Sequence, residues 1–337
     1  MHMADALLSP AVGLAMSAVS VAAIGTSVAK IKKDEFGEKK IPIMGVAGAL
    51  VFAGQMINFT IPGTGSSGHI GGGILLAGLV GAVPAFLSIA AVLIIQCLFF
   101  ADGGLLALGC NIFNLGVIPC LLIFPLIFKP LIHRGATYKR LSLASILSVV
   151  VALQLGALCV VFETLLSGIT ELPFVTFIGL MLPIHLVIGV VEGIVTAGVL
   201  CFVYAMRPEI IEPWAGERLS GVSTKKVLLT LAASTVIIGG GLSLFASANP
   251  DGLEWAIEHT TPGAGGEVDT SGVHEGAARA QEGTAILPDY AFGSDPDNPL
   301  GTSVSGLVGA LVTFTLAGGT GLAISQVKKR KRHGAHA

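Results

Sequence analysis

Residues 70–101 read IGGGILLAGLVGAVPAFLSIAAVLIIQCLFFA and contain no charged side chain. A helix crosses the core of a bilayer with about 20 consecutive apolar residues. The stretch therefore predicts one full crossing at 85–101 and a shorter apolar segment at 70–83. The same criterion gives seven further spans, at 8–29, 42–60, 104–128, 141–166, 172–206, 227–247 and 303–327. We predict an all-α polytopic membrane protein with nine hydrophobic segments, two of them short.

The composition agrees with a membrane protein. The 337 residues are 53% hydrophobic and 12% charged, with a mean hydropathy of +0.83, and the charged fraction is about half that of a soluble domain. The net charge of −2 indicates no nucleic acid partner. All five cysteines lie in apolar runs without CxxC spacing, so we expect small packing residues and neither disulfides nor a thiolate metal site. Because no basic segment precedes residues 7–29, we expect a retained first helix there and no cleaved signal peptide.

The basic residues predict the orientation. Lys and Arg gather in the connectors that stay in the cytoplasm, and nine crossings place every basic cluster on one side. The amino terminus is then outside and the carboxyl terminus is cytoplasmic, in a multi-pass protein of the cell membrane. The clusters are Lys30, Lys32, Lys33, Lys39 and Lys40, then Lys129, His133, Arg134, Lys139 and Arg140, then Arg207, Arg218, Lys225 and Lys226, and finally 328–332.

Two parts are predicted along the chain. Residues 1–206 form a body of about seven helices, 207–226 form a cytoplasmic linker, and 227–327 form a two-helix hairpin followed by a basic cytoplasmic tail at 328–337. The hairpin encloses an external loop at 249–302, which holds ten acidic residues and one basic residue, Arg279.

The segment at 70–83 is too short for a full crossing, since it rises only about 20 Å as a helix. The Gly-rich residues 62–69 before it would then lie at membrane depth, where irregular backbone is tolerated only inside protein or along a cavity. We therefore expect a pocket around His69, whose imidazole needs a partner at that depth. A ligand and a helix cap are equally plausible roles for His69.

Met1 and His2 offer a chelate. The α-amine, the His2 backbone nitrogen and the His2 Nδ1 can close fused five- and six-membered rings on one metal ion, and one more imidazole completes a nitrogen plane. Square-planar nitrogen coordination is typical of Ni(II) or Cu(II). His69, on the same side of the membrane, is the candidate fourth donor, although a His at position two is usually incidental.

Other polar residues lie near these donors or within the spans. Asn58 and Ser67 are candidates for orienting the imidazole, although Ser67, like Gln55, is as readily explained by hydrogen bonds between helices. Asp102 begins an Asp-Gly-Gly turn and is expected to cap the next helix. Asn111 and Asn114 continue a polar string that starts at Gln96.

His185 and Glu192 are seven residues apart and share one helix face. Ionisable residues within a membrane span are candidates for function, and a hydrogen bond that locks the bundle explains the pair almost as well. The sequence has no GxxxxGK[ST] loop and no HExxH or GxSxG motif, so we expect neither ATP hydrolysis nor another enzymatic activity on this chain.

Several stretches together resemble a known family. They are Met1-His2, Gly68-His69-Ile70, 96–104 (QCLFFADGG), 108–114 (LGCNIFN) and 185–193 (HLVIGVVEG). Residues 1–206 resemble the CbiM/NikM substrate-specificity components of energy-coupling-factor (ECF) transporters for nickel and cobalt. Residues 227–327 resemble the small companion subunit of those transporters, because 250–254 is similar to its PDGLE signature and 288–292 fits its later external loop.

The resemblance implies a metal-importing subunit. Ni²⁺ or Co²⁺ would be held by the Met1 amine, the His2 amide and imidazole nitrogens and His69, as transported substrate and with no resident cofactor. A coupling membrane subunit and two cytoplasmic ATPases on other chains would supply energy, and the loop at 249–302 would assist loading or gating. The sequence departs from the family at 3–6, where Met-Ala-Asp-Ala replaces the usual Ile-Pro-Asp-Gly, so the turn behind the donors is expected to differ.

Two alternatives remain on the sequence alone. A secondary transporter of another small solute would use His185 and Glu192 as a proton relay. A membrane enzyme would use His69 and Asp102 at a catalytic metal, and no recognisable motif favours it. The choice between nickel and cobalt also stays open, since subfamilies with this motif are assigned to either metal.

Overall fold

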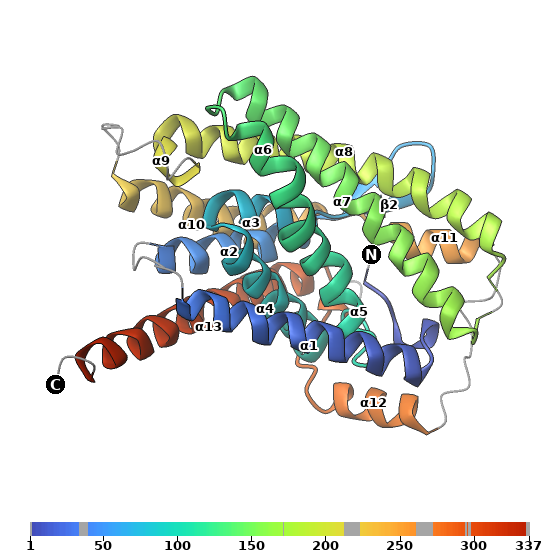
Figure 1. The fold of residues 1–337 in the computed structure, drawn as a ribbon. Coiled ribbons are helices and arrows are strands. Elements are labelled where there is room, and N and C mark those ends of the chain that lie inside the picture. Colours follow the sequence, from blue (N-terminus) through green and yellow to red (C-terminus); the bar gives the residue numbers. More distant parts are fainter. Residues whose placement is uncertain are drawn as a thin grey trace.

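The computed structural model describes residues 2–33, 40–170, 172–211, 223–260, 272–293, 295 and 298–334. These residues are mainly helical, and Figure 1 shows a bundle of long helices. Within them, seven helical spans are long and apolar enough to cross a membrane, which confirms the predicted all-α polytopic fold. They are Pro10–Ile31, Ala82–Phe100, Leu108–Ile132, Tyr138–Ser167, Phe174–Met206, Thr224–Phe245 and Leu300–Gly319.

The first part of the chain is built almost wholly from helices. They are η1 (Asp5–Leu7), α1 (Pro10–Lys33), α2 (Lys40–Gln55), α3 (Gly73–Val80), α4 (Ala82–Phe100), α5 (Leu108–Ile112), η2 (Phe113–Phe128), α6 (Lys129–Ile132), α7 (Tyr138–Ser167) and α8 (Phe174–Met206). The wide turns of η2 contain Pro119 and Pro125. Proline lacks the N–H of a regular helical turn, and the span from α5 to α6 continues through both prolines without a break.

At the predicted segments 42–60 and 70–83, the helices of the structure are shorter than the spans that are long enough to cross a membrane. Helix α2 ends at Gln55 and not at 60, because residues 59–61 enter a small hairpin of β1 (Phe59–Ile61) and β2 (Ser66–Gly68). Helix α3 begins at Gly73 and has only eight residues. The expectation of a short third segment behind non-helical backbone is thereby confirmed, with the correction that most of this backbone is an antiparallel hairpin.

The second part of the chain packs on the first. It contains α9 (Pro208–Ile211), α10 (Thr224–Gly240), η4 (Leu242–Phe245), α11 (Gly252–Thr260), α12 (Val273–Glu282), η5 (Pro288–Tyr290) and α13 (Leu300–Gly334). Helix α13 lies directly against α2, since a Cβ added to Gly45 would meet the Phe314 ring at 3.2 Å. Helices α10 and α13 approach at Gly239 and Gly306, where only glycine leaves room for the facing backbone.

The predicted linker and tail fall partly outside the described residues. Within the linker at 207–226, α9 and the start of α10 are described, and 212–222 are not. The predicted tail at 328–337 is not separate from the last helix, because α13 continues through its first residues to Gly334. In Figure 1, α9 and the last turns of α13 lie at one end of the bundle, and α11 and α12 lie toward the other.

The external loop predicted at 249–302 holds more regular structure than expected. Local hydrogen bonds explain where its first helix begins: Asp251 Oδ1 accepts from the backbone N–H groups of Leu253 and Glu254, and Glu254 Oε2 accepts from the N–H of Asp251. This reciprocal pair is a capping box, which begins α11. The predicted loop is thus corrected to a folded segment that contains α11, α12 and η5.

Candidate metal site

The amino-terminal segment is anchored inside the bundle by its backbone. Asn111 Oδ1 accepts the N–H of Met3 at 2.8 Å, and Asn111 Nδ2 donates to the Met3 carbonyl at 3.2 Å. The N–H of Gly104 donates to the same carbonyl at 2.9 Å, and the Met3 side chain is fully buried. Asn111, singled out from the sequence as a polar residue in a span, thus fixes the residue that follows His2.

Asp5 holds the next turn of this segment. Its Oδ1 accepts the N–H of Ala107, the residue that precedes α5, at 2.9 Å. The sequence predicts Asp102 as the cap of this helix, and that prediction is wrong, because Asp102 accepts a hydrogen bond from Tyr290 instead. Although residues 3–6 depart from the family pattern, Met3 and Asp5 are both firmly bonded.

His2 and His69 lie face to face. Their ring centroids are 5.3 Å apart and their planes differ by 12°. His69 Nδ1 lies 3.1 Å from the Ile70 carbonyl, and His2 Nδ1 lies 3.3 Å from Asp102 Oδ1. Burial lowers the pKa of His2, and it lowers the pKa of His69 to about 4. Both imidazoles are therefore neutral near pH 7, as a metal ligand must be.

Glu192 holds the loop that carries His69. Its two carboxyl oxygens accept the N–H groups of Gly71 and Gly72, at 2.9 and 2.8 Å, and its side chain is buried. Gly72 has a φ of 77°, a left-handed conformation that favours glycine. Gln55 Nε2 donates to the Gly71 carbonyl at 3.0 Å. The sequence identifies Glu192 as an intramembrane residue, and the structure shows that it fixes this loop.

Carboxyl groups surround the two imidazoles. A cavity of 430 Å³ is lined by His2, His69, Asn58, Gln55 and Gln96, and a second cavity of 340 Å³ lies on another side of His2. Four acidic residues line both cavities: Asp102, Asp251, Glu254 and Asp289. Burial and the nearby Asp251 raise the pKa of Glu254, and burial and Asp102 raise the pKa of Asp289. Crowded carboxylates of this kind attract a cation.

The segment around α11 closes this site. The Pro250 carbonyl accepts the N–H of Ser67 at 2.8 Å, and Ser67 Oγ donates to the Asn249 carbonyl at 2.8 Å. Ser67, a candidate for orienting His69, thus joins β2 to the second part of the chain, and Asn58 lines the larger cavity. Tyr290 donates its hydroxyl to Asp102 Oδ2 at 2.5 Å. The site residues predicted from the sequence do not include Asp251, Glu254, Asp289 or Tyr290.

The remaining polar candidates lie deeper in the bundle. Asn114 Nδ2 donates to Glu163 Oε2 at 2.8 Å, which joins η2 to α7. His185 Nδ1 lies 2.8 Å from the carbonyl of Met181, one turn earlier on α8. Neither Asn114 nor His185 lines the cavities of 430 and 340 Å³.

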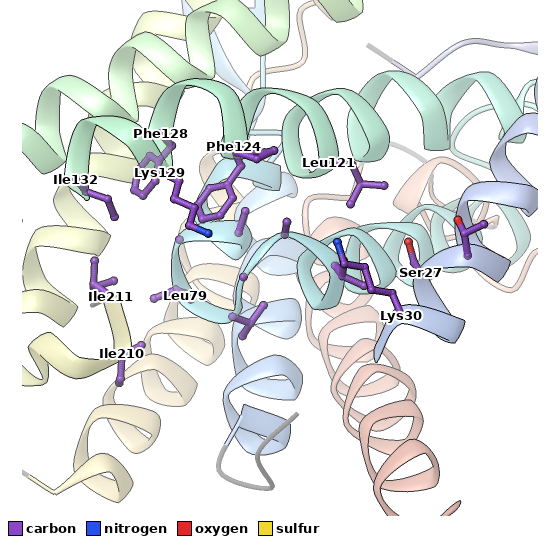
Figure 2. A pocket seen from close by; sticks show the side chains of 18 residues that line it. Ser27, Lys30, Leu79, Leu121, Phe124, Phe128, Lys129, Ile132, Ile210 and Ile211 are labelled. Atoms are coloured by element: carbon purple, nitrogen blue, oxygen red, sulfur yellow. The ribbon is translucent and has the colours of Figure 1, made fainter. Parts of the chain in front are cut away.

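A larger cavity, of 570 Å³, lies among α1, α3, α4, η2, α6 and α9. Figure 2 shows its lining, with apolar side chains such as Leu79, Phe124 and Ile211 and two lysines, Lys30 and Lys129. The two ammonium groups repel a divalent cation, and the described residues that line the cavity include no carboxylate or imidazole. It is therefore no candidate for the metal site.

Met1, the predicted first donor, lies outside the described residues. Among the residues that are described, no three His, Cys, Asp or Glu side chains are close enough to hold a metal ion together.

The fold and these residues define a multi-pass integral membrane protein with two neutral imidazoles in an acid-lined chamber. Comparison with known families then identifies it further. Residues 2–210 match the CbiM family, described as the cobalt uptake substrate-specific transmembrane region, and residues 225–326 match the PDGLE domain. The chain belongs to the CbiM family and carries a PDGLE domain behind it.

Individual relatives share the same organisation. A protein of Archaeoglobus fulgidus, assigned as a putative fused nickel transport protein NikMN, is 30% identical over 94% of this chain and 96% of its own length. The fused nickel transport protein NikMN of Rhodobacter capsulatus is 28% identical over the same shares. The crystal structure of a truncated transition metal transporter matches 61% of this chain and 99% of its own, with 29% identity and a TM-score of 0.53.

Proposed function

We propose that this chain is the substrate-binding membrane subunit of an importer for Ni²⁺ or Co²⁺. The metal would be held by the Met1 amine, the backbone and Nδ1 nitrogens of His2, and His69. The observation that carries the proposal is the stacking of the His2 and His69 rings, 5.3 Å apart, within a chamber lined by carboxylates. The metal would replace Asp102 as the partner of His2 Nδ1.

Nickel is the better candidate cargo. Four planar nitrogens, one of them a deprotonated amide, suit Ni(II) more than Co(II). The fused relatives of Archaeoglobus fulgidus and Rhodobacter capsulatus are named for nickel transport, and the description of the CbiM family names cobalt. We propose nickel as the preferred metal and cobalt as the second.

We propose that energy comes from a coupling membrane subunit and two cytoplasmic ATPases on other chains. Helix α1 offers a surface for such a subunit, because only 17% of the residues in its apolar stretch are buried within this chain. Its small residues Ala11, Ala15, Ala18 and Ala22 are all exposed, and small residues permit close helix contacts in a bilayer. In this arrangement the amino terminus is outside the cell, and Lys30 and Lys129 are on the cytoplasmic side.

The proposal also gives the two parts of the chain different tasks. Residues 1–206 would hold the metal, and 227–327 would cover the site through Asp251, Glu254 and Tyr290. Asn58 would orient the ligands from the larger cavity, which it lines. The linker at 207–226 would join the two parts on the cytoplasmic side.

Nickel retention by the purified full-length chain tests this function. His2→Ala and His69→Ala should each weaken nickel binding by at least about a hundredfold, the upper end of what outer partners of metal ligands contribute. His133→Ala is the matched control, because His133 is exposed and distant in sequence from both donors. Metal content after gel filtration gives the answer. If both variants retain nickel as the wild-type chain does, the proposed site is wrong.

A further inference from the structure

A small cavity of 20 Å³ adjoins His69 on the side of α8. Its volume suffices for about one water molecule or one bare metal ion. Three residues with metal-binding side chains line it, His69, His185 and Asp251, together with Gly68, Gly71 and Gly252 and apolar side chains. It therefore connects the proposed metal site with a histidine that the proposed function does not use.

His185 is held as metal-binding imidazoles are held. A carbonyl oxygen can only accept, so the Met181 carbonyl, 2.8 Å from Nδ1, places the ring proton on Nδ1. The lone pair is then on Nε2. Histidines that bind metals commonly donate one ring N–H to a carbonyl and use the other nitrogen as ligand. The same reasoning applies to His69, whose Nδ1 faces the Ile70 carbonyl.

His185 Nε2 is a buried atom without a hydrogen-bond partner in the described part of the chain. The side chain is 1% exposed. A buried polar atom without a hydrogen-bond partner is unfavourable. If His185 served only to pack the helices, an apolar side chain would do so without this cost. Gly252 shows how closely the second part of the chain approaches this ring, since a Cβ added there would lie 3.2 Å from His185 Cε1.

Polar groups continue beyond His185. A second cavity of 20 Å³ is lined by Gly71, Gly73, Asn114 and Glu192, and Glu192 lies two turns further along the face of α8 that carries His185. Asn114 Oδ1 is also buried without a partner among the described residues. The two small cavities thus lead from His69 into the bundle.

We propose that His185 is a second, transient station for the transported divalent cation. It rests on the proposed function: the ion leaves the His2–His69 site and is taken up by His185 Nε2, with His69 or Asp251 as its other ligand. Because His185 would share the ion with one other side-chain ligand, His69 or Asp251, we expect the station to bind the ion weakly. Weak binding is what transit requires, since an ion must also leave.

Two measurements on the full-length chain test the station. One is nickel retained by the purified protein, and the other is uptake of radioactive nickel by cells in which each variant replaces the wild-type chain. His185→Phe removes the ligand and keeps the volume, and His185→Cys supplies another ligand. His259→Phe is the matched control, because His259 also bonds a carbonyl one turn earlier, that of Trp255, and is exposed.

His185→Phe should retain one nickel ion per chain and take up nickel at least about tenfold more slowly, a loss typical of a group that supports metal binding. His185→Cys should recover part of the rate, and His259→Phe should match the wild type. If His185→Phe takes up nickel at the wild-type rate, His185 is not a station for the ion. An equal loss in the Phe and Cys variants, or loss of retained nickel in His185→Phe, also overturns the station, since either indicates a structural role. Absence of nickel binding and uptake in the wild-type chain would instead contradict the proposed function.

Discussion

Glu192→Ala should weaken nickel binding by about 10- to 100-fold, the range for groups that orient metal ligands. It should also destabilise the chain by about 2 kcal/mol or more, because each of two buried N–H groups left without an acceptor costs roughly 1–3 kcal/mol. The N–H groups of Gly71 and Gly72 lose both acceptors in this variant. The loop that carries His69 then loses its fixed position. Thermal unfolding in detergent and nickel titration measure the two effects.

Two further variants separate loop positioning from the loss of any buried carboxyl group. Glu192→Gln keeps one acceptor oxygen but turns an amide donor toward the other N–H group. Its losses of nickel affinity and of stability should therefore be smaller than those of Glu192→Ala. Glu163→Gln is the control, since Glu163 is also buried and bonds Asn114 instead of the loop. It should affect stability and leave nickel affinity unchanged. Equal losses of affinity in Glu163→Gln and Glu192→Ala would show that the loop contact is not specific.

Gly252→Val should detach α11 from the body of the protein. Even the first atom of a side chain would lie 3.0 Å from Ile188 Cδ1 and 3.2 Å from His185 Cε1, and the branched side chain adds two methyl groups. The contacts that continue from this point, such as the bond from Ser67 N–H to the Pro250 carbonyl, should then open. Hydrogen exchange at the Ser67 amide should accelerate by about tenfold or more, which corresponds to at least about 1.4 kcal/mol of lost protection.

Gly276→Val is the matched control for this effect. Gly276 lies in α12, and a Cβ added there meets nothing within 4 Å. The exchange of the Ser67 amide should therefore stay at its wild-type rate. If Gly252→Val also leaves that rate unchanged, the close packing of α11 on α8 does not hold the second part of the chain over the site.

The membrane fold can be predicted from the sequence because hydrophobic length is a local property. The long spans follow directly from uncharged runs such as 85–101, and the shortness of the third segment already indicates unusual backbone before it. The prediction that His2 and His69 meet rests on the side of the membrane that we expect them to share and on the chelate that a free Met1 amine would form with His2. The structure places the two rings together, and Met1 stays a prediction.

The partners of these residues cannot be predicted in the same way. Asn111 bonds Met3, Glu192 bonds Gly71, and Tyr290 bonds Asp102, all across more than 100 positions. No local pattern encodes such a pairing. The Asp-Gly-Gly turn wrongly predicts Asp102 as the cap of the next helix, because the turn fits that role locally. In the structure, Asp5, far away in the sequence, accepts the hydrogen bond from the N–H of Ala107 at the start of that helix. The PDGLE residues can be matched to a family from the sequence. Their contact with the site, however, is visible only in the structure.

One measurement tests the amino-terminal metal site most directly. The purified chain with its native amino terminus is compared with a chain that carries one extra residue before Met1, by mass spectrometry and visible absorption after loading with nickel. We predict one nickel ion with a planar-nitrogen spectrum in the native chain and none in the extended chain, because the extension removes the free amine from the chelate. Equal nickel binding by both chains, or by neither, would contradict this prediction.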